Sequence, residues 1–318
     1  MEVTERVLAG NIRAIARLMT DLECGRPSAL KALRELYPHT GRAHIVGVTG
    51  APGVGKSTLI DSMTRSLRRR GMKIGILAID PTSPFTGGAL LGDRVRMEKH
   101  NTDPDVFIRS LGTRGGVGGL SRAALSMAHV LDAMGKDMVI IETVGIGQAE
   151  IDITKMTDTS VLVLVPGMGD TIQLMKAGIL EAADIFVVNK CRQDGAEALR
   201  IELESMQGHD RTRPVLLTES SANQGTDEVV EQIIQHRRDL EASGEMAERR
   251  RKRVIYELMS NVEGVVRNTI EADMKDEVER LATDILKKKT DPSTAAAEVL
   301  ARVLSHVERA GGGNAARS

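Results

Sequence analysis

A glycine-rich stretch followed by a lysine and two hydroxyl residues is the strongest chemical signal in the chain. Its residues are Gly50, Ala51, Pro52, Gly53, Val54, Gly55, Lys56, Ser57 and Thr58, spaced as G-x-x-x-x-G-K-[ST]. Such glycines let backbone N–H groups curl around phosphate oxygens, and the helix that follows adds a positive N-terminal potential. In this loop type, the lysine reaches the β- and γ-phosphates and the first hydroxyl coordinates Mg²⁺. The alternative is a tight strand-to-helix turn that binds nothing.

Three carboxylates are candidates for the same site. Asp80 ends the run KIGILAID, Glu142 ends DMVIIE, and Asp93 lies in a glycine-rich stretch between these two runs. Ligands of open α/β sheets bind beyond the carboxyl ends of the strands, so we expect Asp80 and Glu142 to face the phosphates. Mg²⁺ requires oxygen ligands of this kind. Each acid alone would also suit a helix cap or a solvated loop.

The segment from Glu142 to Gly145 looks like the D-x-x-G switch of GTPases, with Glu in place of Asp. The Gly145 amide would then contact the γ-phosphate, and this contact would be lost on hydrolysis. Glycines at such places also simply close turns.

Two further segments favour a guanine base. Asn189 and Lys190 begin an N-K-x-D motif, but Arg192 occupies the fourth position. Arg cannot accept the hydrogen bonds that guanine N1 and N2 donate. Asp194 follows two residues later and would serve if the loop bulges. The triplet Ser221, Ala222 and Asn223 resembles the S-A loop that contacts guanine O6, so the sequence favours GTP over ATP.

The elements that must position these residues form an α/β pattern between Ala43 and about Ser221. Short apolar runs alternate with helical stretches, and continuous apolar runs are typical of buried parallel strands. The runs are HIVGVTG, KIGILAID, VFIRSL, DMVIIET, SVLVLVP, DIFVVNK and PVLLTES. We therefore predict an α/β fold in which a mostly parallel central sheet is flanked by helices and carries the phosphate loop.

Helical segments flank this domain on both sides. Residues 1–42 show apolar positions at helical spacing, residues 43–240 form the nucleotide domain, and residues 241–310 form a charged helical arm. Asp291 opens a last helix whose apolar stripe (Ala296, Val299, Leu300, Val303, Leu304, Val307) predicts packing against another chain or another part of this one. Residues 311–318 are predicted to be a disordered tail. The run from Arg249 to Arg253 is expected to be a solvated helix face.

Composition excludes several classes of protein. The 318 residues carry 43 Lys and Arg against 44 Asp and Glu, a balance that supports neither nucleic-acid binding nor a membrane surface. Three Phe, two Tyr and no Trp offer no platform for stacking bases. Cys24 and Cys191 suit a reducing compartment, and we see neither a signal peptide nor zinc-ligand spacing. We expect a cytoplasmic protein.

With these residues in place, the chain resembles the MeaB-type (ArgK/MeaB) family of P-loop GTPases. These are G-protein chaperones of adenosylcobalamin-dependent acyl-CoA mutases of the methylmalonyl-CoA type. The resemblance extends over nearly the whole length. It is carried by GAPGVGKST, DPTS, TGGALLGDRVRM, RGGVGGLSR, ETVGIGQAE and PGMGDTIQLMKAGILEAADIFVVNK. The order and spacing of these blocks are far more selective than the phosphate loop alone.

The resemblance implies a Mg²⁺-dependent GTPase that gates cofactor loading of a mutase and helps to expel damaged cofactor. Lys56, Asp80, Asp93 and Glu142 match the family's phosphate and Mg²⁺ residues, with Ser57 as a further metal ligand. Asp170, Gln173 and Lys176 fall in a segment that acts as an extra switch facing the mutase. The family also implies a homodimer held by the C-terminal helices, and a cobalamin adenosyltransferase as a further partner.

Two alternatives belong to other functional classes. A metallochaperone NTPase for nickel enzymes predicts a His-rich tract or a Cys pair near the site, and neither is visible in the sequence. A small-molecule kinase of the same P-loop class needs an acceptor pocket with a positioned base, and the sequence identifies no such residue.

Overall fold

The computed structural model describes residues 2–80, 100, 102–112, 117–143, 148–167, 179–207 and 213–312. Within it, the chain divides into two compact units, residues 1–257 and residues 258–318. No helix among the described residues combines the length and the apolar character needed to cross a bilayer.

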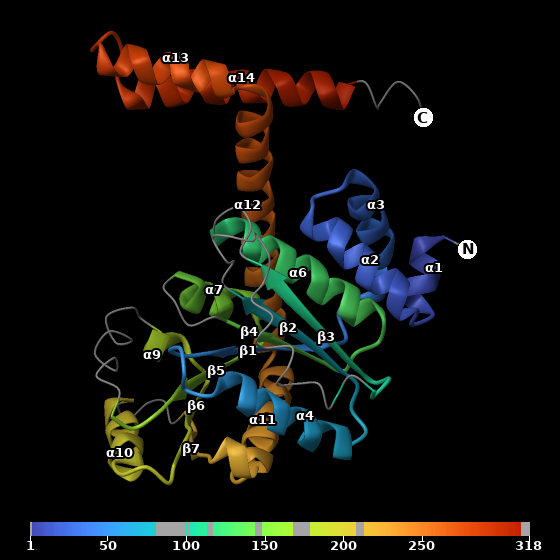
Figure 1. Cartoon of the computed structure of the whole chain (residues 1–318), viewed down its shortest axis with the longest axis vertical. Coiled ribbons are helices and arrows are strands. Elements are labelled where there is room, and N and C mark those ends of the chain that lie inside the picture. The colour runs from blue at the N-terminus through green and yellow to red at the C-terminus, as the bar shows by residue number, and fades with distance from the viewer. Residues whose placement is uncertain are drawn as a thin grey trace. The chain divides into compact units, whose positions relative to one another are not determined.

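One all-parallel sheet forms the centre of the first unit (Figure 1). Its strands lie in the order β3-β2-β4-β1-β5-β6-β7, and each pairs in parallel with its neighbours. They are β1 (His44–Thr49), β2 (Ile74–Asp80), β3 (Val106–Gly112), β4 (Met138–Glu142), β5 (Thr159–Leu164), β6 (Ile185–Val188) and β7 (Val215–Leu217). All seven predicted runs are strands, which confirms the predicted fold class.

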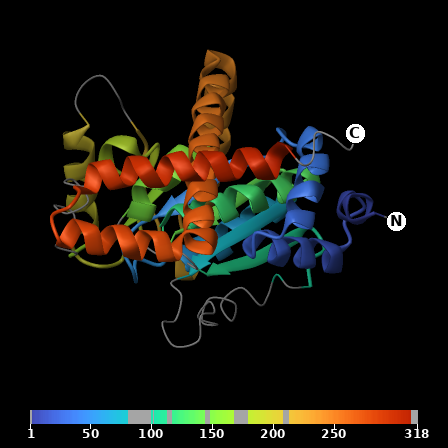
Figure 2. The same cartoon turned by 90° about the horizontal axis from the view of Figure 1, so that it is seen from above.

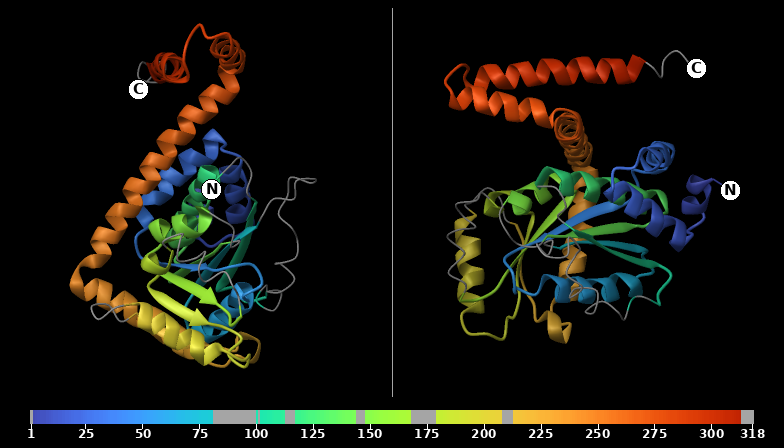
Figure 3. Two further views of the ribbon diagram at one scale, coloured as in Figure 1. Left: turned by 90° about the vertical axis from the view of Figure 1, so that its left-hand side faces the viewer. Right: turned by 45° about the horizontal axis from the view of Figure 1, so that its top comes forward.

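Helices cover both faces of this sheet (Figure 3). On one face, α6 (Val117–Ala133) and α7 (Gln148–Met156) share a core with the N-terminal helices. On the other face, α4 (Lys56–Arg69) and α11 (Thr226–Ser243) pack against the central strands. Near β5 and β6 lie α9 (Ile179–Ala182) and α10 (Ala196–Met206), and the short 3-10 helix η3 (Ser220–Ala222) follows β7. Because both faces are covered, β1, β4 and β5 are buried along their whole length.

The N-terminal residues form the helices that the sequence predicts. These are α1 (Val3–Leu8), α2 (Ile12–Glu23) and α3 (Pro27–Leu36), followed by the 3-10 turn η1 (Tyr37–His39). The Asn11 side chain caps α2 by accepting a 3.0 Å hydrogen bond from the Ala14 amide. Ile15, Leu18, Met19 and Leu22 are buried at helical spacing against the rest of this unit.

Only helices continue the described chain beyond residue 244: α12 (Glu245–Asp273), α13 (Lys275–Leu286) and α14 (Pro292–Gly312). In the second unit, α13 and α14 lie side by side (Figure 2). The Arg302 guanidinium contacts Glu277 at 3.0 Å, and Leu281 and Val303 are buried. Asp291 accepts hydrogen bonds from the amides of Ser293 and Thr294, so the predicted start of the last helix is confirmed.

The run from Arg249 to Arg253 is only partly the solvated face that the sequence predicts: Arg251 and Lys252 are exposed, whereas Arg249 and Arg253 bind acids of the sheet edge. The Arg249 guanidinium makes two hydrogen bonds to Asp184, at 2.8 and 3.0 Å, and Arg253 donates to Asp158 at 2.5 Å. Arg253 is 8% exposed and Asp158 is fully buried. Both acids immediately precede strands, which places them at the amino-terminal edge of the sheet, where α12 begins. Burial alone would raise the pKa of Asp184, but the Arg249 guanidinium outweighs it and holds that pKa below its ordinary value.

His44 is a buried histidine at the same edge. Its Nε2 lies 2.7 Å from Thr159 Oγ1, and its Nδ1 lies 3.8 Å from Asp158 Oδ2. Burial is the main cause that lowers the pKa of His44 to about 4; the Asp158 charge opposes the shift, and nearby Arg237 and His236 add to it. His44 is therefore neutral in the folded chain at ordinary pH.

Acid is expected to weaken the fold through His44. The unfolded chain takes up this proton near pH 6.5, whereas the folded chain does so near pH 4. Between these values the unfolded state binds more protons, so the free energy of unfolding falls as the pH drops, by roughly 3 kcal/mol over the window. Urea unfolding of wild type and His44→Gln between pH 7.5 and pH 4.5 measures this term. Identical pH dependence in the two proteins would contradict it.

Candidate functional site

The phosphate loop connects β1 to α4 at the carboxyl edge of the sheet. Gly50 and Gly55 have φ values of +143° and +92°, in the region that favours glycine. A Cβ on Gly50 would lie 2.2 Å from the Val163 carbonyl oxygen, and one on Gly55 would lie 2.5 Å from Asn189 Nδ2. The loop is therefore wedged between β5 and the end of β6, and only glycine suits these two positions.

Lys56 is the first residue of α4 and lies over the loop. Its Nζ donates to the carbonyl oxygens of Gly50 at 2.7 Å and Ala51 at 3.1 Å, and the side chain is only 7% exposed. A buried cation at the N-terminus of a long helix produces a strongly positive local potential. This arrangement suits an anionic ligand such as phosphate.

Ser57 and Glu142 meet beside Lys56. The Ser57 hydroxyl donates to Glu142 Oε1 at 2.6 Å, and Glu142 is 5% exposed at the end of β4. The pairing of β4 with β1 places Glu142 opposite Val48, two residues before the loop. The residues that follow on the same two strands are also in contact: the hydroxyls of Thr49 and Thr143 lie 2.9 Å apart. The pair brings together buried oxygens of the type that Mg²⁺ prefers.

Asn189 connects the phosphate loop to the loop after β7. Its Nδ2 donates to the Val54 carbonyl at 2.8 Å. Its Oδ1 accepts from the Thr218 hydroxyl at 3.1 Å and from the Ser220 amide and hydroxyl at 3.1 and 2.8 Å. The next residue, Lys190, has φ +55° and donates from Nζ to the Gly53 carbonyl at 2.9 Å.

The triplet Ser221, Ala222 and Asn223 is exposed at η3, and α4 holds it in place. Ser62 Oγ donates to the Ser220 carbonyl at 3.0 Å and also bonds the Asn223 side chain. The helix that begins with Lys56 therefore also positions the loop after β7. Sequence reasoning missed Ser62, Thr218 and Ser220. Ser220 directly precedes the predicted triplet, but no pattern singled out Ser62.

The fourth position of the N-K-x-D segment lies at the surface. Arg192 and Asp194 are both exposed, in a turn closed by a 2.9 Å hydrogen bond from the Gln193 amide to the Lys190 carbonyl. Arg192 approaches Gln224 Oε1 at 3.4 Å. Asp194 is thus close along the chain to Lys190 without being buried.

Several predicted site residues lie outside the described structure. Asp80 ends β2, next to β4 in the sheet, but its side chain is not described. Asp93, Gly145, Asp170, Gln173 and Lys176 fall in segments outside the described residues. Of the four predicted catalytic residues, the structure therefore describes the side chains of Lys56 and Glu142, and Glu142 bonds Ser57, the residue that follows Lys56.

An all-parallel sheet with a glycine-rich loop between β1 and α4 defines the P-loop nucleotide-binding class. Residues 15–275 match the family model described as methylmalonyl Co-A mutase-associated GTPase MeaB. The chain belongs to this family, and it is a GTPase that binds guanine nucleotide.

Known proteins similar to this chain support the assignment. An inferred GTPase of Pyrococcus horikoshii is 46% identical over 311 residues, covering 95% of this chain and 98% of its own. The GTPase ArgK of Escherichia coli is 33% identical over 285 residues and 86% of each chain. A solved structure described as a LAO/AO transport system kinase superposes with a TM-score of 0.70 at 26% identity, covering 95% of this chain and 97% of its own. The kinase activity is named for that protein and is not carried over to this chain.

Loss of the Lys56 charge is expected to abolish GTP hydrolysis. Removing a single positioned donor from such a site costs about 100-fold or more in rate. The Lys56 contacts described above are with loop carbonyls, so Lys56→Ala should keep its circular dichroism spectrum. Lys73→Ala, an exposed lysine just before β2, is the matched control. Phosphate release measures the rate, and unchanged turnover in Lys56→Ala would contradict the assignment.

Proposed function

We propose that this GTPase is a Mg²⁺-dependent chaperone of an adenosylcobalamin-dependent acyl-CoA mutase. The observation that carries the proposal is the match of residues 15–275 to a family of mutase-associated GTPases. In this role, GTP hydrolysis gates cofactor loading and helps to expel damaged cofactor. The two free cysteines, Cys24 and Cys191, agree with a cytoplasmic setting.

In the proposed site, residues 50–58 hold the nucleotide phosphates. Lys56 leaves its contacts with the loop carbonyls and pairs with the β- and γ-phosphate oxygens, since a phosphate ligand offers it a full negative charge. The Ser57 hydroxyl and the Glu142 carboxylate hold Mg²⁺, and Asp80 and Asp93 complete the set of acids. When bound, Mg²⁺ would supply charge neutralisation at the nucleotide phosphates. The Gly145 amide would report the presence of the γ-phosphate.

The base would lie between two loops that the structure joins. Asn189 fixes Val54 on one side and Ser220 on the other, so the phosphate and base sites keep a constant separation. Ser221, Ala222 and Asn223 offer backbone donors to guanine O6. Asp194 is our candidate for the acceptor of guanine N1–H and N2–H₂, in place of the usual fourth residue of N-K-x-D.

Mutase binding is assigned to the segment that contains Asp170, Gln173 and Lys176, and the partner set includes a cobalamin adenosyltransferase. We place the dimer contact on the helical arm, residues 241–310. Within the second unit, Leu258, Met259, Val262 and Val265 form a stripe on α12 with exposures between 50% and 60%. On α14, Leu300 and Leu304 are 48% and 56% exposed. A second copy of this chain would bury these apolar surfaces.

Asp194→Ala should weaken guanine binding specifically. A charged hydrogen-bonding pair is worth about 1.5–3 kcal/mol, so GDP affinity should fall roughly 10- to 100-fold. ADP offers no N1–H and should respond little. Isothermal titration with both nucleotides compares wild type, Asp194→Ala and the neighbouring control Arg192→Ala. If Asp194→Ala binds GDP as tightly as wild type and Arg192→Ala do, the guanine base is recognised by another group.

The partner proposal predicts a complex that depends on the bound nucleotide. Sedimentation velocity of candidate acyl-CoA mutases mixed with this chain, with GDP or with a non-hydrolysable GTP analogue, should give a complex whose stability differs between the two. The chain alone should sediment as a dimer, and Val262→Glu should weaken that dimer by placing a charge on the stripe. Absence of a complex with either nucleotide would contradict the mutase role. A wild-type monomer at tens of micromolar would contradict the dimer.

A further inference from the structure

The N-terminal helices enclose a pocket that shares no residue with the nucleotide site. Its volume is about 500 Å³, and α1, α2 and α3 supply its walls. Such a volume is typical of sites for small organic molecules. Ala14, Leu18, Ala29 and Ala32 are nearly buried and form its apolar floor, with the exposed Val3 beside them.

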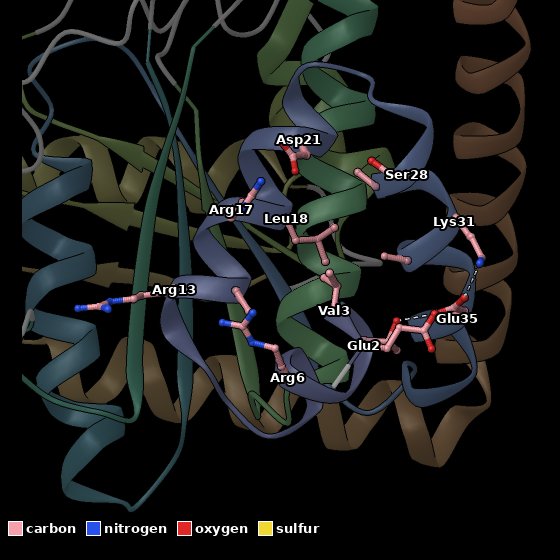
Figure 4. Close-up of a pocket in the computed structure, with 14 residues that line it drawn as sticks. Glu2, Val3, Arg6, Arg13, Arg17, Leu18, Asp21, Ser28, Lys31 and Glu35 are labelled. Atoms are coloured by element: carbon pink, nitrogen blue, oxygen red, sulfur yellow. Dashed lines mark hydrogen bonds and ion pairs between the residues drawn. The ribbon is translucent and has the colours of Figure 1, made fainter.

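The charges around this pocket are unevenly distributed. Figure 4 shows Arg6, Arg13 and Arg17 on one side and Glu2, Lys31 and Glu35 on the other. In this view the Arg13 side chain points away from Leu18 and the other labelled side chains.

The carboxylates that line the pocket have partners within these helices. Asp21 pairs with Arg26 at 2.7 Å, and the Glu2 side chain accepts from the Glu5 amide in a capping box. Glu35 accepts from the Thr4 hydroxyl at 2.6 Å and lies 4.0 Å from Lys31. The acidic side chains of the pocket are therefore already paired with other groups of this chain.

The three arginines that line the pocket have no such partners in the described part of the chain. Among the described residues, no carboxylate lies within ion-pair distance of Arg6, Arg13 or Arg17. Arg13 and Arg17 are also four residues apart on α2, a spacing at which like charges destabilise a helix. Four basic side chains line the pocket against three acidic ones, so the pocket carries an excess of positive charge, to which Arg6 and Arg17 contribute without an ion-pair partner among the described residues.

The second described pocket lacks this imbalance. It lies between α7, α9 and the start of α12, where three basic side chains (Lys155, Arg249, Lys252) are matched in number by three acidic ones (Glu181, Asp184, Glu245). Arg249 binds Asp184 and Glu245, and Lys155 lies 3.6 Å from Asp152.

We propose that the N-terminal pocket binds a small organic anion. Its carboxylate or phosphate group is held by Arg6 and Arg17, whose planar guanidinium groups suit bidentate pairing with either oxyanion. A short aliphatic part lies on Leu18 and the floor alanines. Binding at this site gives the GTPase a second ligand, independent of the guanine nucleotide.

The test uses the full chain saturated with GDP and Mg²⁺, so that the phosphate loop is filled. Butyl phosphate and hexanoate are the two anionic probes, and 1-butanol is the neutral control. Saturation-transfer NMR measures their affinities for wild type and for three variants: Arg6→Gln, Arg17→Gln and the double variant. Arg34→Gln, an exposed arginine on α3 outside the pocket, is the matched control.

At least one anionic probe should bind wild type and Arg34→Gln equally, and the double variant should bind it at least about tenfold more weakly. Comparison of the two probes decides between phosphate and carboxylate. GTP hydrolysis should be unchanged in all variants, which separates this site from the nucleotide site. The proposal is overturned if neither anion binds below about 10 mM, if 1-butanol binds as well as the anions, or if the double variant binds like wild type.

Discussion

The side-chain amide of Asn189 joins the phosphate loop to the loop after β7, and we propose that the nucleotide lies between these two loops. Its nitrogen donates to the Val54 carbonyl and its oxygen accepts from Ser220, so one residue at the end of β6 sets the distance between the phosphate loop and the loop after β7. The contact is close enough that a Cβ on Gly55 would collide with it. A buried amide whose hydrogen bonds are satisfied by the chain itself is rigid, because breaking any one of them leaves a polar group unpaired.

Helix α4 extends this constraint to the rest of the site. Its first turn supplies Lys56 and Ser57, and Ser62, farther along the same helix, holds the loop after β7. The carboxyl edge of the sheet is therefore organised for ligands, as expected for an open parallel sheet. The amino-terminal edge serves a different purpose. There Asp158 and Asp184 anchor Arg253 and Arg249 and fix the start of α12 to the sheet.

The sequence predicted most of what depends on local patterns. The seven strands follow from continuous apolar runs, and the phosphate loop follows from glycine spacing. The contact between Ser57 and Glu142 agrees with the expectation that strand ends meet at one edge. The arginine run was only partly interpreted correctly, because the partners of Arg249 and Arg253 lie 65 and 95 residues away in the chain. Helical periodicity describes only the helix itself, and it cannot identify acids contributed by distant strand starts. Ser62 was missed for the same reason, since its partner Ser220 is 158 residues away.

The central claim is that Ser57 and Glu142 form the Mg²⁺ side of a GTP site. Phosphate release from GTP, measured against Mg²⁺ concentration for wild type and Glu142→Gln, tests it most directly. A Gln keeps an acceptor for the Ser57 hydroxyl but removes the charge, so the fold and GDP binding should persist. The account predicts a rate at least about tenfold lower at 1 mM Mg²⁺, partly restored by higher Mg²⁺. Equal rates and equal Mg²⁺ dependence in the two proteins would contradict it.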